Sequence, residues 1–164
     1  MKNLTGQVIY GDHQYDLIWL PGADIKSISP ITQAYGFCYD GDGNLLVIKS
    51  TDLKTWVVPG GTIETGETPE QTLKREIIEE ADTAITNIVY LGAQKATRED
   101  GDTIYQLRYA AKIAELLPRT PDPDSGLIRE RKLIPPLEFG QASGWGEIGE
   151  ELVRLSMEKL HTLE

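Results

Sequence analysis

Three glutamates lie close together in the middle of the chain, at positions 76, 79 and 80. On a helix, the spacings i, i+3 and i+4 place Glu76, Glu79 and Glu80 on one face. Like charges at this spacing repel each other by about 0.2–0.5 kcal/mol per pair, and the C-terminal end of a helix disfavours anions. Carboxylates gathered in this way indicate a site for a hard divalent cation such as Mg²⁺ or Mn²⁺.

A glycine pair and an arginine accompany these glutamates. Gly60 and Gly61 precede the expected helix, and their lack of a side chain permits close approach of the backbone. The Gly60 carbonyl is a candidate metal ligand, and the amides of the pair can face phosphate oxygens. We expect Arg75, beside Glu76, to pair with Glu67 and so fasten the loop to the helix through a charge-assisted hydrogen bond.

This stretch resembles the Nudix box of the MutT-like hydrolases, G-x5-E-x7-R-E-U-x-E-E-x-G-U, in which U is aliphatic. The fixed positions are occupied by Gly61, Glu67, Arg75, Glu76, Ile77, Glu79 and Glu80. Two positions differ from the pattern, because Asp82 replaces the last glycine and Thr83 the final aliphatic residue. The glycine normally ends the helix in a left-handed conformation, which aspartate tolerates better than most residues.

The resemblance implies an α/β fold, a Nudix-type α/β/α sandwich with a mixed sheet, and residues 60–83 as its box. It also implies a hydrolase that cleaves a phosphoanhydride bond in a nucleoside diphosphate linked to another moiety. Gly60, Glu76, Glu79 and Glu80 would hold Mg²⁺ or Mn²⁺, while Glu67 and Arg75 would maintain the architecture of the site. The metal would neutralise the pyrophosphate and lower the pKa of an attacking water.

A general base must accept the proton of that water. The candidates are Glu79 and Glu80 inside the box, and Glu99 and Glu130 outside it. For the last two, an exposed loop carboxylate with no role in catalysis is the commoner interpretation. The sequence does not decide among the four.

Two aromatic residues are candidates for stacking on a base, namely Trp56 and Tyr105, although packing in the core is the commoner role of such residues. Several cations could contact phosphates, although an ordinary surface position is the commoner interpretation for each. They are Lys49, Arg98 and Arg108, and a basic cluster formed by Arg129, Arg131 and Lys132. Sequence markers of several Nudix subfamilies are not evident, which by elimination favours a nucleoside triphosphate pyrophosphatase.

Two other classes of function compete with the enzyme. The chain could be a Nudix-fold module that binds or senses a nucleotide without cleaving it, but such modules usually lose box carboxylates that are kept here. The acidic helix face could instead be a surface for protein interaction. That alternative explains the acidic face and leaves the spaced glycine, glutamate and arginine residues unexplained.

The elements that must position these residues can be predicted from periodicity and capping signals. A helix is expected over residues 69–81, because Thr68 and Gln71 form a capping box, Pro69 suits the first turn, and an apolar stripe repeats every fourth residue. Strands are expected at 7–10, 16–20, 33–39, 44–49, 85–94, 105–114 and 129–134. A second helix is expected over 147–160, with Ile148, Leu152, Leu155 and Met157 inward, and a long loop over 117–126.

Residues 1–164 are expected to form one Nudix domain in which residues 1–30 are an added β hairpin. Edge strands can pair between subunits, so a homodimer is a hypothesis. The net charge of −10 argues against broad binding to nucleic acid or to anionic membranes, and leaves a nucleotide-type small molecule as the expected partner. No apolar run approaches the roughly 20 residues that cross a bilayer, and the first residues lack a secretory signal pattern. The single cysteine, Cys38, is expected in the core. Together these observations favour the cytoplasm.

Overall fold

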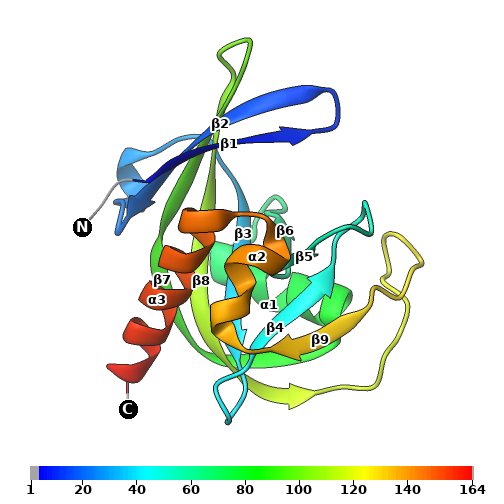
Figure 1. The fold of residues 1–164 in the computed structure, drawn as a ribbon. Coiled ribbons are helices and arrows are strands. Elements are labelled where there is room, and N and C mark those ends of the chain that lie inside the picture. The colour runs from blue at the N-terminus through cyan, green and yellow to red at the C-terminus, as the bar shows by residue number, and fades with distance from the viewer. Residues whose placement is uncertain (1–3, 164) are drawn as a thin grey trace.

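The computed structural model of the protein describes residues 4–163, in which a mixed β-sheet lies between two helical layers (Figure 1). The strands are β1 Thr5–Tyr10, β2 His13–Pro21, β3 Ile31–Tyr39, β4 Leu45–Lys49, β5 Trp56–Val57, β6 Gly60–Thr62, β7 Thr83–Arg98, β8 Thr103–Leu116 and β9 Arg131–Ile134. Their order is β1-β2-β7-β8-β3-β4-β5, with β6 on β3 and β9 on β4. Only β3 and β8 pair in parallel among the described strands, so the expected mixed α/β fold is confirmed.

The helix that carries the glutamates is α1, Pro69–Ala81, at the bounds that the sequence predicts. Its capping box is present, because the Thr68 hydroxyl accepts a hydrogen bond from the Gln71 amide and the Gln71 side chain accepts one from the Thr68 amide. The apolar stripe, Leu73, Ile77 and Ala81, is fully buried. Burial of this stripe fixes the rotation of α1 and therefore the direction of its carboxylates.

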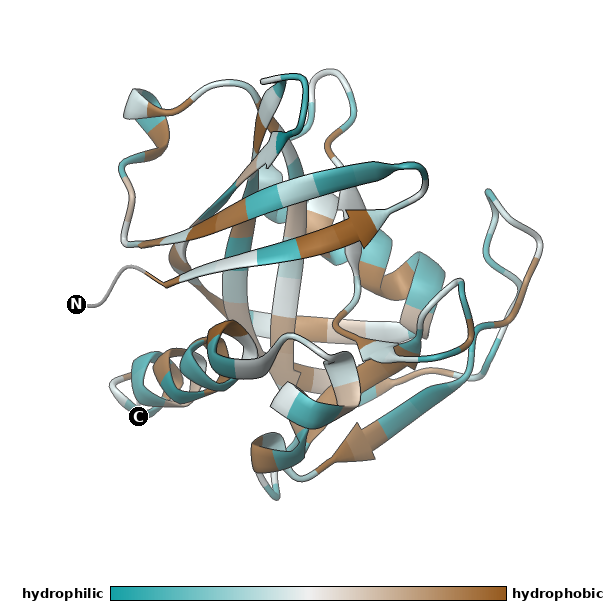
Figure 2. Ribbon diagram, turned by 45° about the horizontal axis from the view of Figure 1, so that its top comes forward, coloured by the Kyte–Doolittle hydropathy of each residue, from teal (hydrophilic) through white to brown (hydrophobic). Residues whose placement is uncertain are grey.

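The second layer contains α2, Phe139–Ser143, and α3, Gly146–His161, with short 3-10 turns η1, Ile25–Ser27, and η2, Pro136–Glu138. Each layer has its own core cluster, one against α1 and one against α3, because side chains alternate across the sheet. Along β8, Leu107 and Tyr109 face α1, whereas Ala110 faces α3. In Figure 2, α3 carries both hydrophobic and hydrophilic stripes, as expected for a helix that packs on one side only.

Several expectations need correction or extension. The two long strands run beyond their predicted bounds, since 85–94 extends to 83–98 and 105–114 to 103–116, and irregular pairing interrupts the alternation on which the bounds were based. The last strand begins at Arg131 instead of at residue 129. Met157 is 43% exposed, so its inward placement was wrong, whereas Cys38 is buried as expected.

Strands β1 and β2 form a hairpin, in which β1 pairs with β2 alone among the described strands and lies at the edge of the sheet. Its end is apolar and exposed, at Val8, Ile9 and Tyr10, as the brown arrowhead of β1 in Figure 2 shows. None of the helices within residues 4–163 combines the length and the apolar character that crossing a bilayer requires.

Candidate active site

Arg75 organises the carboxylates of α1. Its Nε donates to Glu67 Oε2 over 2.8 Å, and its Nη2 donates to the Thr62 carbonyl over 3.0 Å. Its Nη1 donates to Glu76 Oε1 over 3.0 Å and to Glu79 Oε2 over 3.1 Å. One guanidinium therefore ties the loop before α1 to two of the three glutamates, and it includes the expected pair with Glu67.

Glu67 is a fixed anion in this arrangement. The hydrogen bond from Arg75 lowers the pKa of Glu67 to about 2, and donation from the Glu64 amide over 3.0 Å lowers it further. The Thr72 hydroxyl also donates to Glu67, over 2.9 Å. With its oxygens used in this way, Glu67 anchors the loop to α1 instead of facing a substrate.

Glu76 and Glu80 lie close enough for their carboxyl groups to share a hydrogen bond. Burial raises the pKa of both groups, that of Glu80 to about 8, while Arg129 opposes the rise with a guanidinium 2.6 Å from Glu80 Oε2. A divalent cation would offset the repulsion between the two neighbouring carboxylates and lower the pKa of both, which would leave them as hard anionic ligands. This donor set therefore suits Mg²⁺ or Mn²⁺.

The glycine pair adjoins the carboxylates directly. A Cβ atom on Gly61 would lie 2.5 Å from the carboxyl carbon of Glu76, and one on Gly60 would lie 2.5 Å from the Tyr35 ring. Any larger residue at position 61 would displace Glu76, so β6 and α1 fit together only with glycine there. The backbone of β6 is thus positioned beside the carboxylates, as a carbonyl ligand from Gly60 would require.

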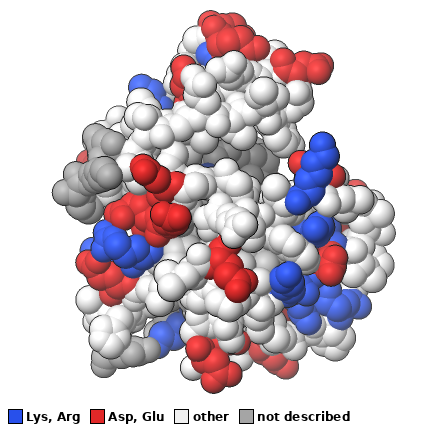
Figure 3. Space-filling view, viewed as in Figure 1, with Lys and Arg blue, Asp and Glu red and all other residues white. Residues whose placement is uncertain are grey.

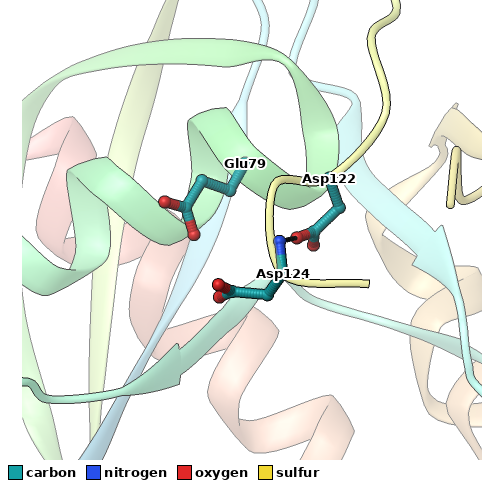
Figure 4. A group of neighbouring side chains, drawn as sticks. All are labelled: Glu79, Asp122 and Asp124. Atoms are coloured by element: carbon teal, nitrogen blue, oxygen red, sulfur yellow. Dashed lines mark hydrogen bonds between the residues drawn. The ribbon is translucent and has the colours of Figure 1, made fainter. Parts of the chain in front are cut away.

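Two further acids that the sequence analysis missed lie beside Glu79. Asp122 and Asp124 belong to the loop between β8 and β9, and carboxylate oxygens of the three residues lie within 4.8 Å of one another (Figure 4). The Asp122 side chain also accepts a hydrogen bond of 2.8 Å from the Asp124 amide, which shapes the turn. The only signal in the sequence was an Asp-Pro-Asp run more than 40 residues from α1, and nothing local says where such a loop folds.

Asp82, one of the two departures from the box, holds this loop in place. It ends α1 in the left-handed conformation expected there, with φ 45° and ψ 49°. Its carboxylate accepts hydrogen bonds from the Thr120 amide over 3.0 Å, the Thr120 hydroxyl over 2.7 Å and Arg119 over 3.0 Å. Arg131 donates to the carbonyls of Ala81 and Asp82 over 2.9 and 3.0 Å, which caps the end of the helix.

The basic cluster surrounds the other side of the carboxylates. Arg129 bridges Glu80 and the Lys49 carbonyl, which its Nε reaches over 2.9 Å. The amines of Lys49 and Lys132 lie 4.6 and 4.4 Å from the centre of the half-buried Trp56 ring. In Figure 3, basic side chains gather over β4 and β9, whereas acidic groups dominate much of the rest of that face.

The remaining candidates lie elsewhere. Arg98 and Glu99 are in the turn between β7 and β8, where Arg98 bonds Asp100 and Glu99 pairs with His13 over 2.9 Å. Tyr105 packs against the core cluster on the α1 side of the sheet. The structure does not bring Arg98 or Glu99 to the α1 carboxylates.

Glu130 is exposed, and its carbonyl accepts the Lys49 amide. Arg108, expected to be an ordinary surface cation, is only 3% exposed, so that expectation was wrong. Its position on a central strand of the sheet explains its burial.

A family model for the NUDIX domain matches residues 31–155, which is most of the chain. The chain belongs to the Nudix family. A MutT-like protein from Streptomyces ambofaciens is 51% identical over 39 residues, which cover 24% of this chain and 25% of that protein, so the match spans about a quarter of this curated relative.

Solved Nudix structures share the fold. A mutant of the Bacillus subtilis pyrophosphohydrolase BsRppH superimposes with a TM-score of 0.69 at 19% identity, covering 99% of this chain and 97% of the other. The MutT protein of Bacillus halodurans gives a TM-score of 0.58 at 21% identity, covering 74% and 80%. At these identities the likeness shows the fold, and Nudix hydrolases in general use divalent metal ions and act on nucleotide-type substrates.

Proposed function

We propose that this Nudix hydrolase is a Mg²⁺- or Mn²⁺-dependent nucleoside triphosphate pyrophosphatase, which releases a nucleoside monophosphate and pyrophosphate. The observation that carries the proposal is the carboxylate face of α1, which Arg75 holds beside the glycine pair of β6. The names of the similar structures, a pyrophosphohydrolase and MutT proteins, agree with this class of reaction.

The residues proposed to hold the metal are Glu76, Glu79 and Glu80 with the carbonyl of Gly60. When bound, a divalent cation would neutralise the phosphates and lower the pKa of the attacking water. In its absence Arg75 and Arg129 neutralise part of the negative charge.

Glu79 is the proposed general base. Its Oε2 is oriented by Arg75, and its other oxygen is free of described hydrogen bonds within residues 4–163. Burial raises the pKa of Glu79, and the charges of Asp124 and Asp122 raise it further, which strengthens it as a proton acceptor. Glu80 is less suited, because Arg129 and Glu76 already engage its carboxyl group.

The basic cluster is proposed to receive the phosphate chain. Arg129 lies at the boundary between the carboxylates and the lysines, and it can exchange Glu80 for a phosphate oxygen when a cation replaces its positive charge there. Trp56, between Lys49 and Lys132, forms the edge of this surface. A nucleotide substrate of this kind agrees with the cytoplasmic location that the sequence favours.

The test is a phosphate-release assay with purified protein, Mg²⁺ and a panel of nucleoside triphosphates, run with and without added inorganic pyrophosphatase. We expect phosphate to appear only when pyrophosphatase is present, and EDTA to abolish the signal. Phosphate released without pyrophosphatase would show that a different bond is cleaved. Absence of turnover on the whole panel, by folded protein, would contradict the proposal.

A homodimer through the hairpin also belongs among the proposals. The edge strand β1 carries the exposed residues Val8, Ile9 and Tyr10, which could pair with a second copy. Light scattering on the full chain tests this, and a monomer at working concentration would refute it.

A further inference from the structure

Within residues 4–163, Arg108 of β8 is a buried cation without an anionic partner. It is 3% exposed, and among the described residues neither its Nε nor its Nη1 has a hydrogen-bond acceptor. Its Nη2 donates to Gln106 Oε1 over 3.0 Å and, at the limit of a hydrogen bond, to Gln94 Oε1 over 3.5 Å. A buried guanidinium that lacks partners destabilises a fold, so its presence calls for an explanation outside folding.

The surroundings of Arg108 are aromatic and amide groups. The guanidinium lies 4.8 Å from the centre of the Tyr35 ring and 5.5 Å from that of the Trp145 ring. Gln94 and Gln106 complete the polar surroundings, and Gln106 also donates to Gln33. Cation–π contacts stabilise the positive charge in part, but they leave the N–H groups of Nε and Nη1 unused.

This group of residues adjoins the proposed metal site through a single side chain. The Tyr35 ring lies under Arg108 on one side and against Gly60 on the other, where a Cβ would come within 2.5 Å of the ring. The next residue of β6, Gly61, contacts Glu76 in the same manner. In Figure 3 the surface is hollowed below the β1–β2 hairpin, on the side of the sheet that carries Trp145 and the start of α3.

We propose that Arg108, with Gln94, Gln106, Tyr35 and Trp145, forms the subsite for the nucleobase of the substrate. Its unused N–H groups would donate to a base that presents a carbonyl oxygen beside a ring nitrogen, as guanine does. The amides can both donate and accept, which suits the mixed edge of a base better than a phosphate. The two rings offer surfaces for stacking.

This subsite rests on the proposed function, because a phosphate chain at the α1 carboxylates sets where the base must lie. Tyr35, whose ring lies 4.8 Å from the Arg108 guanidinium, also interacts electrostatically with Glu80 and Glu76, as one molecule that reaches both groups would require. A phosphate subsite is the competing interpretation, and it predicts a different response to the loss of Arg108.

The decisive experiment compares Arg108→Met with the wild type on GTP, ATP and inorganic tripolyphosphate, which has phosphoanhydride bonds and no base. We expect kcat/KM on GTP to fall about 10- to 100-fold, the range for a lost side-chain contact to a base, with a smaller fall on ATP. Activity on tripolyphosphate should be unchanged. The matched control is Arg154→Met, which removes an exposed arginine of α3 that pairs only with acids of its own helix among the described contacts and should leave all three substrates unaffected.

An equal fall on all three substrates would overturn the base subsite in favour of a phosphate contact, and no fall on any substrate would overturn it altogether.

A binding measurement separates this result from failure of the proposed function. A GTP analogue with methylene bridges should bind the wild type in the presence of Mg²⁺ and bind Arg108→Met at least about tenfold more weakly. If the analogue binds with this difference while no nucleotide is cleaved, the subsite stands and the proposed reaction is refuted. If Arg108→Met does not fold, Gln94→Leu and Gln106→Leu, which remove only amides, should lower GTP selectivity in the same direction.

Discussion

The carboxylate face of α1 and the surroundings of Arg108 differ in whether their charged groups have partners of opposite charge. On α1, three acids lie together and each has a cation within 3.1 Å, either Arg75 or Arg129. Around Arg108, one cation is buried among amides and rings, and none of the acids that the structure describes lies within hydrogen-bond distance of it. The two arginines offset part of the negative charge of the first region, where we propose that a metal binds, whereas the second region keeps a buried positive charge that we propose a ligand contacts.

The two regions also differ in how the chain builds them. The carboxylates, Arg75 and the glycine pair come from residues 60–80, a strand, a turn and one helix. The Arg108 group draws on β3, β7, β8 and the connection between α2 and α3. The residues of the proposed chemistry are therefore encoded locally, while those of the proposed base subsite are brought together by the tertiary structure.

The largest expected effect comes from the carboxylates. Glu79→Gln and Glu80→Gln should each lower kcat by about 10²–10⁴-fold, the range for a lost base or electrostatic group. Both residues are proposed metal ligands, so each substitution should raise the Mg²⁺ concentration for half-maximal activity. If Glu79 is also the base, the loss of activity in Glu79→Gln will persist at saturating Mg²⁺, whereas part of the activity of Glu80→Gln will return there. Steady-state titrations with Mg²⁺ distinguish the two. An unchanged kcat in Glu79→Gln would refute its role as base.

Arg75 should have the next largest effect, because it acts by orienting the carboxylates. Arg75→Lys keeps the charge but cannot reach Glu67, Glu76 and Glu79 together, so we expect activity to fall about 10- to 100-fold, as for other groups that orient metal ligands. Raising Mg²⁺ should restore part of it. The control is Lys74→Arg at the exposed neighbouring position, which should behave as the wild type. Full activity of Arg75→Lys would show that this orientation is unimportant.

The loop between β8 and β9 brings Asp122 and Asp124 beside Glu79 of α1. Substitutions of these two acids should have an intermediate effect on activity. Asp122→Asn and Asp124→Asn remove charges that raise the pKa of Glu79, so each should lower kcat by about tenfold. The matched control is Asp42→Asn, in the exposed turn after β3. Loss of activity in the control as well would mean that the effect is only that of net charge.

Asp82 tests whether the loop is held from the end of α1. Asp82→Gly keeps the left-handed end of the helix but removes the acceptor for Thr120 and Arg119, and hydrogen bonds to a charged group contribute about 1.5–3 kcal/mol. We expect hydrogen exchange in residues 117–131 to become faster while that of α1 changes little. Equal exchange in the two proteins would show that the loop does not depend on Asp82.

The contrast between the α1 carboxylates and the Arg108 group also explains how much of this site the sequence predicts. The position and caps of α1, its buried stripe and the Arg75–Glu67 pair follow from spacings of three, four and eight residues, which a helix converts directly into contacts. Asp122 and Asp124 could not be found in this way, because their approach to Glu79 depends on the path of a loop between distant strands. Arg108 was mistaken for a surface residue, since a charged residue inside a strand is ordinarily expected to face solvent.

The smallest effect, and the one that separates function from folding most directly, concerns stability. Because Arg108 is buried without an acid, replacing it by methionine removes an uncompensated charge and keeps most of its volume. We expect Arg108→Met to be as stable as the wild type or more stable, by about 1 kcal/mol, which corresponds to an increase in Tm of about 2–4 °C for a chain of this size. Arg129→Met should do the opposite, since it leaves the buried carboxyl of Glu80 without its cation. Thermal unfolding in EDTA measures both. A large loss of stability in Arg108→Met would mean that the fold itself needs this cation, and the difference between the two regions would then be one of packing alone.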